Sequence, residues 1–299
     1  MFTVPKSKQI RLIVDTDARC EADDAFAIVH DLLTPQFQVK GILAEHFGER
    51  PGVESSMLAS YEESKTIVDI MGLTDRVPVL KGAEGPIRSE TDYDYSEAAE
   101  LIYREAMKED EPRLFITLQG AITNLACAYL RHPEIAGRIT AVWVGGGVYP
   151  QGGWEFNMNA DIKAANVILQ SGIELWQIPI NVYTRLRTSL TELEMKVGRQ
   201  GVIGQYIFSE MVKFNDALAE VPGWPMGECW SLGDSATVGV LLDPMAYYRE
   251  QREAPVVQPD CTYQFTGSGR PITVYHSIDE RFILEDFFAK MEKYAESGH

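Results

Sequence analysis

The order of apolar and polar positions predicts alternating strands and helices over the first two thirds of the chain. Short, nearly continuous apolar runs such as Gln9–Val14 and Arg113–Leu118 are typical of strands buried on both faces. Longer segments with apolar residues at helical spacing follow, as in Ala22–Leu33 and in Val53–Met71, which is closed by Gly72. This alternation predicts an α/β fold with a mostly parallel open sheet and helices on both faces.

The same pattern predicts further elements with definite bounds. These are strands at Gln38–Ala44, Arg76–Leu80, Ile139–Val144 and Ile173–Ile180, and helices at Ser96–Lys108, Ile122–Leu130 and Asp161–Gln170. No Pro/Ser-rich linker, internal repeat or low-complexity tract divides the chain, so we expect residues 1–299 to form one domain.

Two regions depart from the alternation. Residues from about Thr188 to Leu232 have helical periodicity, and we expect them to form a lid-like segment. In the tail, Thr262–Phe265 and Ile272–Tyr275 flank a Gly-Ser-Gly-Arg turn, which predicts a hairpin. A final helix is expected from Ile278 to about Tyr294.

Composition and charge narrow the function classes. The 299 residues include 27 Lys and Arg against 44 Asp and Glu, a formal net charge of −17, and 45 % are hydrophobic. A surface this acidic repels phosphate backbones and anionic lipids. We therefore expect no nucleic-acid partner and no membrane association. No apolar run approaches membrane-spanning length, no signal peptide is visible, and the four cysteines lack CxxC spacing, which together predict a cytoplasmic protein without a zinc or redox pair.

A cluster of acidic residues is the most informative local feature. Five carboxylates lie between Asp15 and Asp24, at the junction of the first strand and first helix. Loops at the carboxyl ends of parallel strands bind ligands in α/β proteins. Asp15 and Asp17 are expected to point the same way, while Asp23 and Asp24 also suit ordinary helix caps. Carboxylates packed this closely repel one another unless a cation neutralises them, and oxygen-only ligands favour Ca²⁺ or Mg²⁺.

Three other motifs fit these residues poorly. An EF-hand loop requires an acid or Asn where Arg19 stands and a Gly where Cys20 stands. Aspartyl-phosphate phosphatases share the Asp-x-Asp after a strand, but they expect Thr or Val at Arg19 and a second Asp after Gly233–Ser235. No Walker A motif occurs, and Gly145–Gly147 does not match a dinucleotide-binding loop.

Several motifs in order resemble one family. The strand followed by DTD, DD and AFAI resembles the N-terminal signature of the inosine–uridine preferring nucleoside hydrolases. Further similar segments are Ile116–Ala126, Val142–Gly147, Glu155–Asp161, Gly233–Thr237, Leu241–Pro244 and the tail GSGRPITVYHSIDERFILEDFF. The matches extend from about residue 10 to 290, which implies the fold of that family.

The resemblance implies a set of site residues around one Ca²⁺. The implied ligands are Asp17, Asp24, Asp234 and the backbone carbonyl of Gln119, and Asp17 would also accept the proton of the attacking water. Asp23 would bind a ribose hydroxyl, and Glu155 and Asn157 would hold the sugar. The implied partner is a small-molecule nucleoside or sugar, and family members are usually homo-oligomers. For Asp161 we expect only a helix N-cap.

The sequence also departs from the family pattern. The loop between Asp17 and Asp23 is two residues longer, so Arg19, Cys20 and Glu21 have no counterpart; Glu21 replaces a ligand or Arg19 projects into the cleft. Gly233 stands where the family has a His that protonates the departing base. The longer loop resembles a divergent branch of the family that is sometimes linked to carbohydrate metabolism.

Other side chains are candidates for the missing roles. His46 follows a strand at the same edge of the sheet and is a candidate acid, although a lone His there is commonly structural. Tyr183 is a weaker candidate because of its high ordinary pKa. Trp224 and Trp230 precede Asp234, where they would stack on the substrate or pack a lid against the core.

Three hypotheses follow for the function. The first is a Ca²⁺-dependent glycosidase that hydrolyses an N-ribosyl or related glycosidic bond, including a carbohydrate-metabolism hydrolase of unknown substrate. The second is a non-catalytic, metal-dependent sugar- or nucleoside-binding protein. The third is a phosphate-ester hydrolase that uses the same acidic loop, which the surrounding acidity disfavours.

Overall fold

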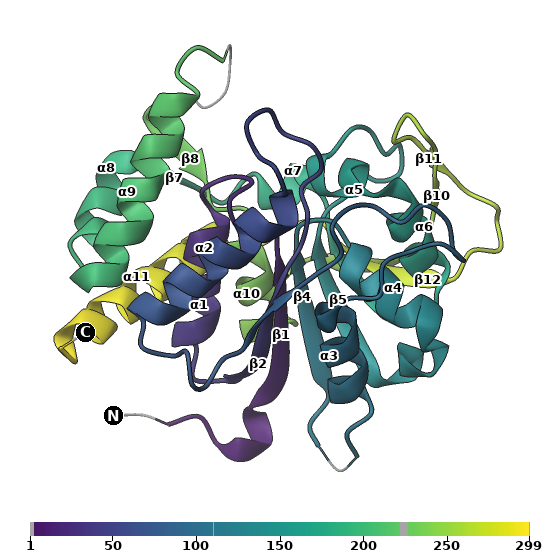
Figure 1. Ribbon diagram of the computed structural model, residues 1–299, viewed down its shortest axis with the longest axis horizontal. Helices are drawn as coiled ribbons and strands as arrows, with labels where there is room; N and C mark the ends of the chain where they lie inside the picture. The colour runs from purple at the N-terminus through teal and green to yellow at the C-terminus, as the bar shows by residue number, and fades with distance from the viewer. Residues whose placement is uncertain (1–2, 110, 222–226, 299) are drawn as a thin grey trace.

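An eight-stranded sheet is the central element of the computed structural model, which describes residues 3–109, 111–221 and 227–298 (Figure 1). Its strand order is β3-β2-β1-β4-β5-β6-β12-β9. All neighbouring strands pair in parallel except β9, which lies antiparallel to β12 at one edge. The strands are β1 (Ile10–Thr16), β2 (Phe37–Ala44), β3 (Val79–Lys81), β4 (Leu114–Gln119), β5 (Ile139–Val144), β6 (Glu174–Ile178), β9 (Arg249–Glu253) and β12 (Pro271–Tyr275). The mostly parallel α/β fold predicted from the sequence is confirmed.

Successive residues of the central strands pack into two separate cores. Leu12 and Val14 of β1 contact one core, whereas Ile13 contacts the other, because side chains alternate along a strand. Both faces are therefore apolar, which explains the continuous apolar runs in the sequence.

Helices cover both faces of the sheet (Figure 1). On one face lie α1 (Asp24–Leu33), α2 (Ser56–Ile70), α9 (Gly201–Ala217), α10 (Ser235–Leu242) and α11 (Glu280–Glu296). On the other lie α3 (Glu97–Ala106), α4 (Thr123–Arg131) and α6 (Ile162–Gln170). Short helices are α5 (Phe156–Ala160), α7 (Ile180–Tyr183), α8 (Leu190–Leu193), η1 (Lys6–Lys8), η2 (Pro133–Arg138) and the π-helical η3 (Glu194–Gly198).

The direction in which the chain adds strands reverses at β1. The chain proceeds from β1 to β2 and β3 on one side, and then to β4, β5 and β6 on the other. Open α/β sheets bind ligands outside the carboxyl ends of the strands at such a switch point. Thr16 at the end of β1 pairs with Gln119 at the end of β4, so these two residues mark the expected place.

The predicted tail hairpin is wrong. β11 (Tyr263–Gln264) pairs with β10 (Val256–Val257), whereas β12 pairs with β6 and β9. The strand β9 has the sequence Arg-Glu-Gln-Arg-Glu, which lacks an apolar pattern because it is an exposed edge strand. Local turn chemistry favoured a hairpin, but burial of the apolar β12 inside the main sheet decides its pairing.

The region from about 188 to 232 contains α8, η3, α9 and a ribbon formed by β7 (Arg187–Ser189) and β8 (Cys229–Ser231). Helix α9 packs beside α2 and α11 (Figure 1). Whether this segment acts as a lid stays a prediction. All four cysteines are free thiols. Among the described residues, no helix has both the length and the apolarity needed to cross a membrane.

Candidate functional site

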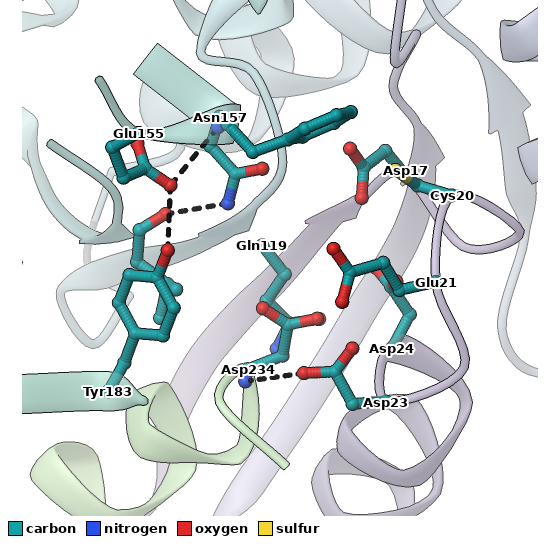
Figure 2. Close-up of a pocket in the computed structure, with 12 residues that line it drawn as sticks. Asp17, Cys20, Glu21, Asp23, Asp24, Gln119, Glu155, Asn157, Tyr183 and Asp234 are labelled. Atoms are coloured by element: carbon teal, nitrogen blue, oxygen red, sulfur yellow. Dashed lines mark hydrogen bonds between the residues drawn. The ribbon is translucent and has the colours of Figure 1, made fainter. Parts of the chain in front are cut away.

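A pocket opens at the switch point predicted from the topology (Figure 2). Asp17, Glu21, Asp23 and Asp24 lie on one side, from the loop after β1 and the start of α1. Glu155, Asn157 and Tyr183 lie opposite, with Gln119 and Asp234 between the two sides. Cys20, Val144 and Phe156 complete the lining.

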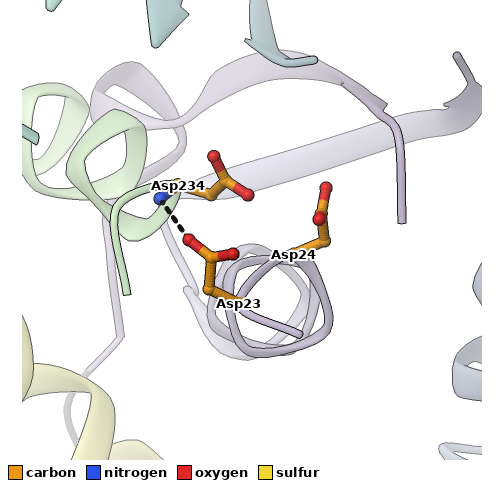
Figure 3. Close-up of side chains that lie close together, drawn as sticks. All are labelled: Asp23, Asp24 and Asp234. Carbon is orange, nitrogen blue, oxygen red and sulfur yellow. Dashed lines mark hydrogen bonds between the residues drawn. The ribbon is translucent and has the colours of Figure 1, made fainter. Parts of the chain in front are cut away.

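Three aspartates of the pocket lie close together (Figure 3). Asp23, Asp24 and Asp234 each offer a carboxylate oxygen, and these oxygens lie within 4.8 Å of one another. Asp234 precedes α10, and its backbone N–H donates to Asp23 Oδ2 at 3.4 Å. The fold thus joins Asp234 to the loop after β1, as the predicted metal site required. The group contains Asp23 where the sequence led us to expect Asp17.

Asp17 lies beside this group, one residue beyond the end of β1. It is buried, and its Oδ2 has no hydrogen-bond partner. Gly120 allows the close approach of the neighbouring backbone, because a Cβ there would lie 3.0 Å from both Cβ and Cγ of Asp17. A buried carboxylate oxygen without a partner is costly, and a cation in the pocket would satisfy it.

The electrostatics of the pocket also favour a cation. Burial, with the nearby carboxylates, raises the pKa of Asp24 to about 7 and that of Glu21 to about 8, and burial raises that of Asp23 to about 6. Burial and the charges of Asp23 and Asp24 hold the pKa of Asp234 well above its ordinary value. Hard oxygen ligands of this kind suit Ca²⁺ or Mg²⁺, so the residues fit a divalent cation.

Hydrogen bonds beneath the pocket orient its acidic residues. Thr16 Oγ1 donates to Asp24 Oδ1 at 2.6 Å. Gln119 Nε2 donates to Thr237 Oγ1 at 3.0 Å and to Asp31 Oδ2 at 3.2 Å, so this side chain is bound within the protein interior. The Thr237 hydroxyl in turn donates to the backbone carbonyl of Asp234 at 2.7 Å. Sequence inspection missed Thr237 and Asp31, because their role depends on contacts between distant segments.

Glu155 organises the opposite wall. As the N-cap of α5, its carboxylate accepts hydrogen bonds from the backbone N–H groups of Asn157 and Met158. It also accepts from the N–H of Gly146 at 2.7 Å and from the Tyr183 hydroxyl at 2.9 Å. The Asn157 amide nitrogen donates to the carbonyl of Val144 at 2.9 Å. These bonds hold Asn157 and Tyr183 facing the pocket (Figure 2).

In the longer loop after Asp17, one charged side chain points away from the pocket and another lines it. Arg19 has a φ of 121° and forms ion pairs with Glu210 of α9 at 2.7 Å and with Glu63 of α2 at 3.3 Å. Glu21, two residues later, lines the pocket. The alternative in which Arg19 projects into the pocket is therefore wrong. The other alternative, in which Glu21 replaces a metal ligand, stays a prediction.

Two predicted residues, His46 and Trp230, are not brought into this pocket. His46 is fully buried, its Nε2 lies 2.8 Å from Thr123 Oγ1, and burial lowers its pKa to about 4, so the structure does not support it as an acid there. Trp230 is buried and packs edge-on against Phe214, a core contact. Trp224 lies outside the described residues.

The expected cap at Asp161 is confirmed: its side chain accepts a hydrogen bond from the N–H of Ala164 at 2.9 Å. Tyr183, a minor candidate in the sequence, lies at the pocket wall. Phe156 was missed, although its position between Glu155 and Asn157 in the EFN segment was a visible signal.

Comparisons with known proteins find relatives that match nearly the whole chain. Among curated relatives, the pyrimidine-specific ribonucleoside hydrolase RihA of Salmonella paratyphi A is 25 % identical over 316 aligned positions, covering 95 % of this chain and 99 % of the relative. RihA of Escherichia coli O9:H4 (strain HS) is also 25 % identical, covering 91 % of this chain and 96 % of the relative.

Solved structures share the fold. A purine-preferring ribonucleoside hydrolase from Gardnerella vaginalis superposes with a TM-score of 0.78 at 20 % identity, covering 96 % of this chain and 99 % of that one. A plant nucleoside hydrolase, PpNRh1, gives a TM-score of 0.75 at 19 % identity with the same coverage. The sequence model of the inosine-uridine preferring nucleoside hydrolases matches residues 12–282. The chain therefore belongs to the inosine-uridine preferring nucleoside hydrolase family.

Proposed function

We propose that this protein is a Ca²⁺-dependent hydrolase that cleaves the N-glycosidic bond of a ribonucleoside-like substrate. The observation that supports it most strongly is the meeting of Asp23, Asp24 and Asp234 in one buried group, beside the unpartnered Asp17 Oδ2. This group stands at the switch point of the sheet, where open α/β sheets bind ligands.

The residues of the pocket suit the chemistry of this reaction. Cleavage of an N-glycosidic bond develops positive charge on the sugar, which the surrounding carboxylates stabilise. A bound divalent cation would lower the pKa of a water molecule and thereby supply a nucleophile. Asp24, Asp234 and either Asp17 or Asp23 would hold the cation.

The remaining groups bind the sugar and take up the proton. Asp17 is well placed to accept the proton of the attacking water, because one of its oxygens has no other partner. Asn157, fixed by its bond to the carbonyl of Val144, would hold the sugar from the opposite wall. Glu155 already accepts four hydrogen bonds, so we propose that it acts by positioning Asn157 and Tyr183.

A substrate panel tests the proposal. The protein is incubated with purine and pyrimidine nucleosides and aryl ribosides, with Ca²⁺ or with a chelator, and free ribose is measured. We expect ribose release only with Ca²⁺, and its loss in Asp17→Asn. Calcium-dependent binding with no product from any compound would instead favour the non-catalytic binding protein. Phosphate release from an aryl phosphate would favour a phosphate-ester hydrolase.

Several finer expectations stay predictions. They are the cytoplasmic location, the homo-oligomeric state, the absence of nucleic-acid and membrane partners and a role in carbohydrate metabolism. The preferred base stays open too, since the relatives above include a pyrimidine-specific and a purine-preferring enzyme.

A further inference from the structure

The lining of the pocket is strongly unbalanced in charge. Six of its residues are carboxylates: Asp17, Glu21, Asp23, Asp24, Glu155 and Asp234. Among the described residues that line it, none is Lys, Arg or His. The nearby Arg19 is paired with Glu210 and Glu63 instead. When all six are ionised, one divalent cation offsets only two of their negative charges, so the site keeps a negative field.

Neither the hydroxyl nor the thiol of the described lining is suited to protonate a departing group. The Tyr183 hydroxyl donates to Glu155, and burial beside this carboxylate raises the phenol pKa, so the proton stays on Tyr183. The thiol pKa of Cys20 is likewise raised well above its ordinary value by burial and the neighbouring acids.

The Tyr183 ring also limits what can stand at position 233. A Cβ added to Gly233 would lie only 2.7 Å from Tyr183 Cδ2. A larger side chain at Gly233 would therefore require the ring to move, so the existing wall leaves no room there for an acid.

These features act differently on neutral and cationic substrates. A neutral nucleoside that cleaves without an acid releases an anionic base among carboxylates, which the field opposes. An N-glycosyl cation already carries its charge on the ring nitrogen. On cleavage that charge passes to the sugar, and no anion forms.

We infer that the preferred substrate is a positively charged N-glycoside, such as an N-ribosylpyridinium, whose leaving group departs as a neutral heterocycle. This inference rests on the proposed function and specifies its substrate class. The bond between C1′ and the ring nitrogen breaks, and its electron pair neutralises the nitrogen. The oxygen of water bonds to C1′, and the proton of this water passes to Asp17 and then to solvent. The products are ribose, the neutral heterocycle and a proton.

Turnover measurements test this preference. We compare N-ribosylpyridinium salts with uridine and inosine in Ca²⁺, dividing each kcat/KM by the uncatalysed rate constant of the same compound. The cationic substrates are expected to show an acceleration at least about 10-fold larger, because a negatively charged cleft attracts cations. Equal or larger acceleration of the neutral nucleosides would overturn the inference while supporting the proposed function.

One variant separates a field effect from an acid. Glu21→Gln should lower kcat/KM more for the cationic substrates than for the neutral ones. The control Glu292→Gln, an exposed change of the same charge on α11, should alter neither. If Glu21→Gln instead impaired only the neutral nucleosides, Glu21 would be their acid and the inference would fail.

A binding experiment keeps the inference testable without turnover. Two non-hydrolysable C-ribosides are compared by calorimetry in Ca²⁺: one bears a neutral pyridine and the other its N-methylpyridinium. The cationic compound should bind about 10-fold more tightly, and this ratio should shrink in Glu21→Gln. Equal affinities would refute the charge preference. Absence of ribose release from every riboside would count against the proposed function separately.

Discussion

Single atoms decide the geometry around Asp17, and Gly120 is the clearest case. The backbone of Gly120 lies so close to Asp17 that it leaves no space for a side chain. A Cβ on Gly120 would lie 3.0 Å from Asp17 Cβ and Cγ and 3.1 Å from the backbone nitrogen of Asp17. All three atoms belong to Asp17, which directly follows the end of β1, so they move less freely than the tip of a long side chain. The position of the Asp17 carboxylate thus depends on a residue that offers no chemistry of its own.

We therefore predict that Gly120→Ala displaces Asp17 and lowers kcat/KM by roughly 100-fold, the scale of a misplacement of about 1 Å. Gly137→Ala is the matched control, because a Cβ at Gly137 would meet no atom within 4 Å. Steady-state kinetics and thermal melts on both variants check this. Unchanged activity in Gly120→Ala would show that the position of Asp17 is not critical.

A second prediction at the scale of single residues concerns Asp234. Its replacement should stabilise the protein without metal but weaken the binding of the metal. In chelator, Asp234→Asn should raise the melting temperature, because it removes a buried acid held beside Asp23 and Asp24. In Ca²⁺, the same variant should bind the ion at least about 10-fold more weakly and lose the metal-induced gain in melting temperature. A lower melting temperature than wild type in both conditions would contradict this arrangement.

At the scale of elements, the sequence was most informative where an element is determined by its own residues. The strands β1, β4 and β5 are apolar on both faces, and the acidic residues after β1 belong to one contiguous segment. Contacts between distant segments were not predicted from the sequence. Examples are the pairing of β12 with β6 and β9 and the hydrogen bond between His46 and Thr123 of α4. Such partners are chosen by tertiary packing, which local periodicity does not encode.

The short helix α5 provides an element-scale prediction. Glu155→Gln replaces one carboxylate oxygen by an NH₂ group, which would face backbone N–H donors that the carboxylate now accepts. We expect a loss of about 2 kcal/mol in the free energy of unfolding, together with lower activity as Asn157 and Tyr183 move. Ser96→Ala, which removes the ordinary N-cap of α3, should cost about 1 kcal/mol and leave activity unchanged. Denaturant unfolding and steady-state kinetics are measured on both variants. If Glu155→Gln were as active as Ser96→Ala, the positioning role of Glu155 would be contradicted.

At the scale of the whole molecule, the acidic pocket links stability to pH and to the metal. The folded protein raises the pKa of Asp23 to about 6, of Asp24 to about 7 and of Glu21 to about 8, from ordinary values of 3.8 for Asp and 4.5 for Glu. These groups bind protons more tightly when folded. The stability that they contribute is therefore present below about pH 4 and is lost as the pH rises through 6 to 8.

Without metal, we thus expect these groups to lower the free energy of unfolding as the pH rises from about 4 to 8. Calcium should reduce this loss, because it stabilises the ionised carboxylates. Thermal melts across this range in chelator and in Ca²⁺ check the prediction. Parallel pH profiles in the two conditions would show that the cation does not bind these carboxylates.

The central claim is that one divalent cation in the acidic pocket enables cleavage of an N-ribosyl bond. Its most direct test is a Ca²⁺ titration of the chelated protein, with heat of binding and ribose release measured on the same preparation. We predict that activity appears in proportion to one bound ion per chain, and that Asp24→Asn shows neither signal. Ribose release that is complete before any ion binds, or that persists in Asp24→Asn, would contradict it.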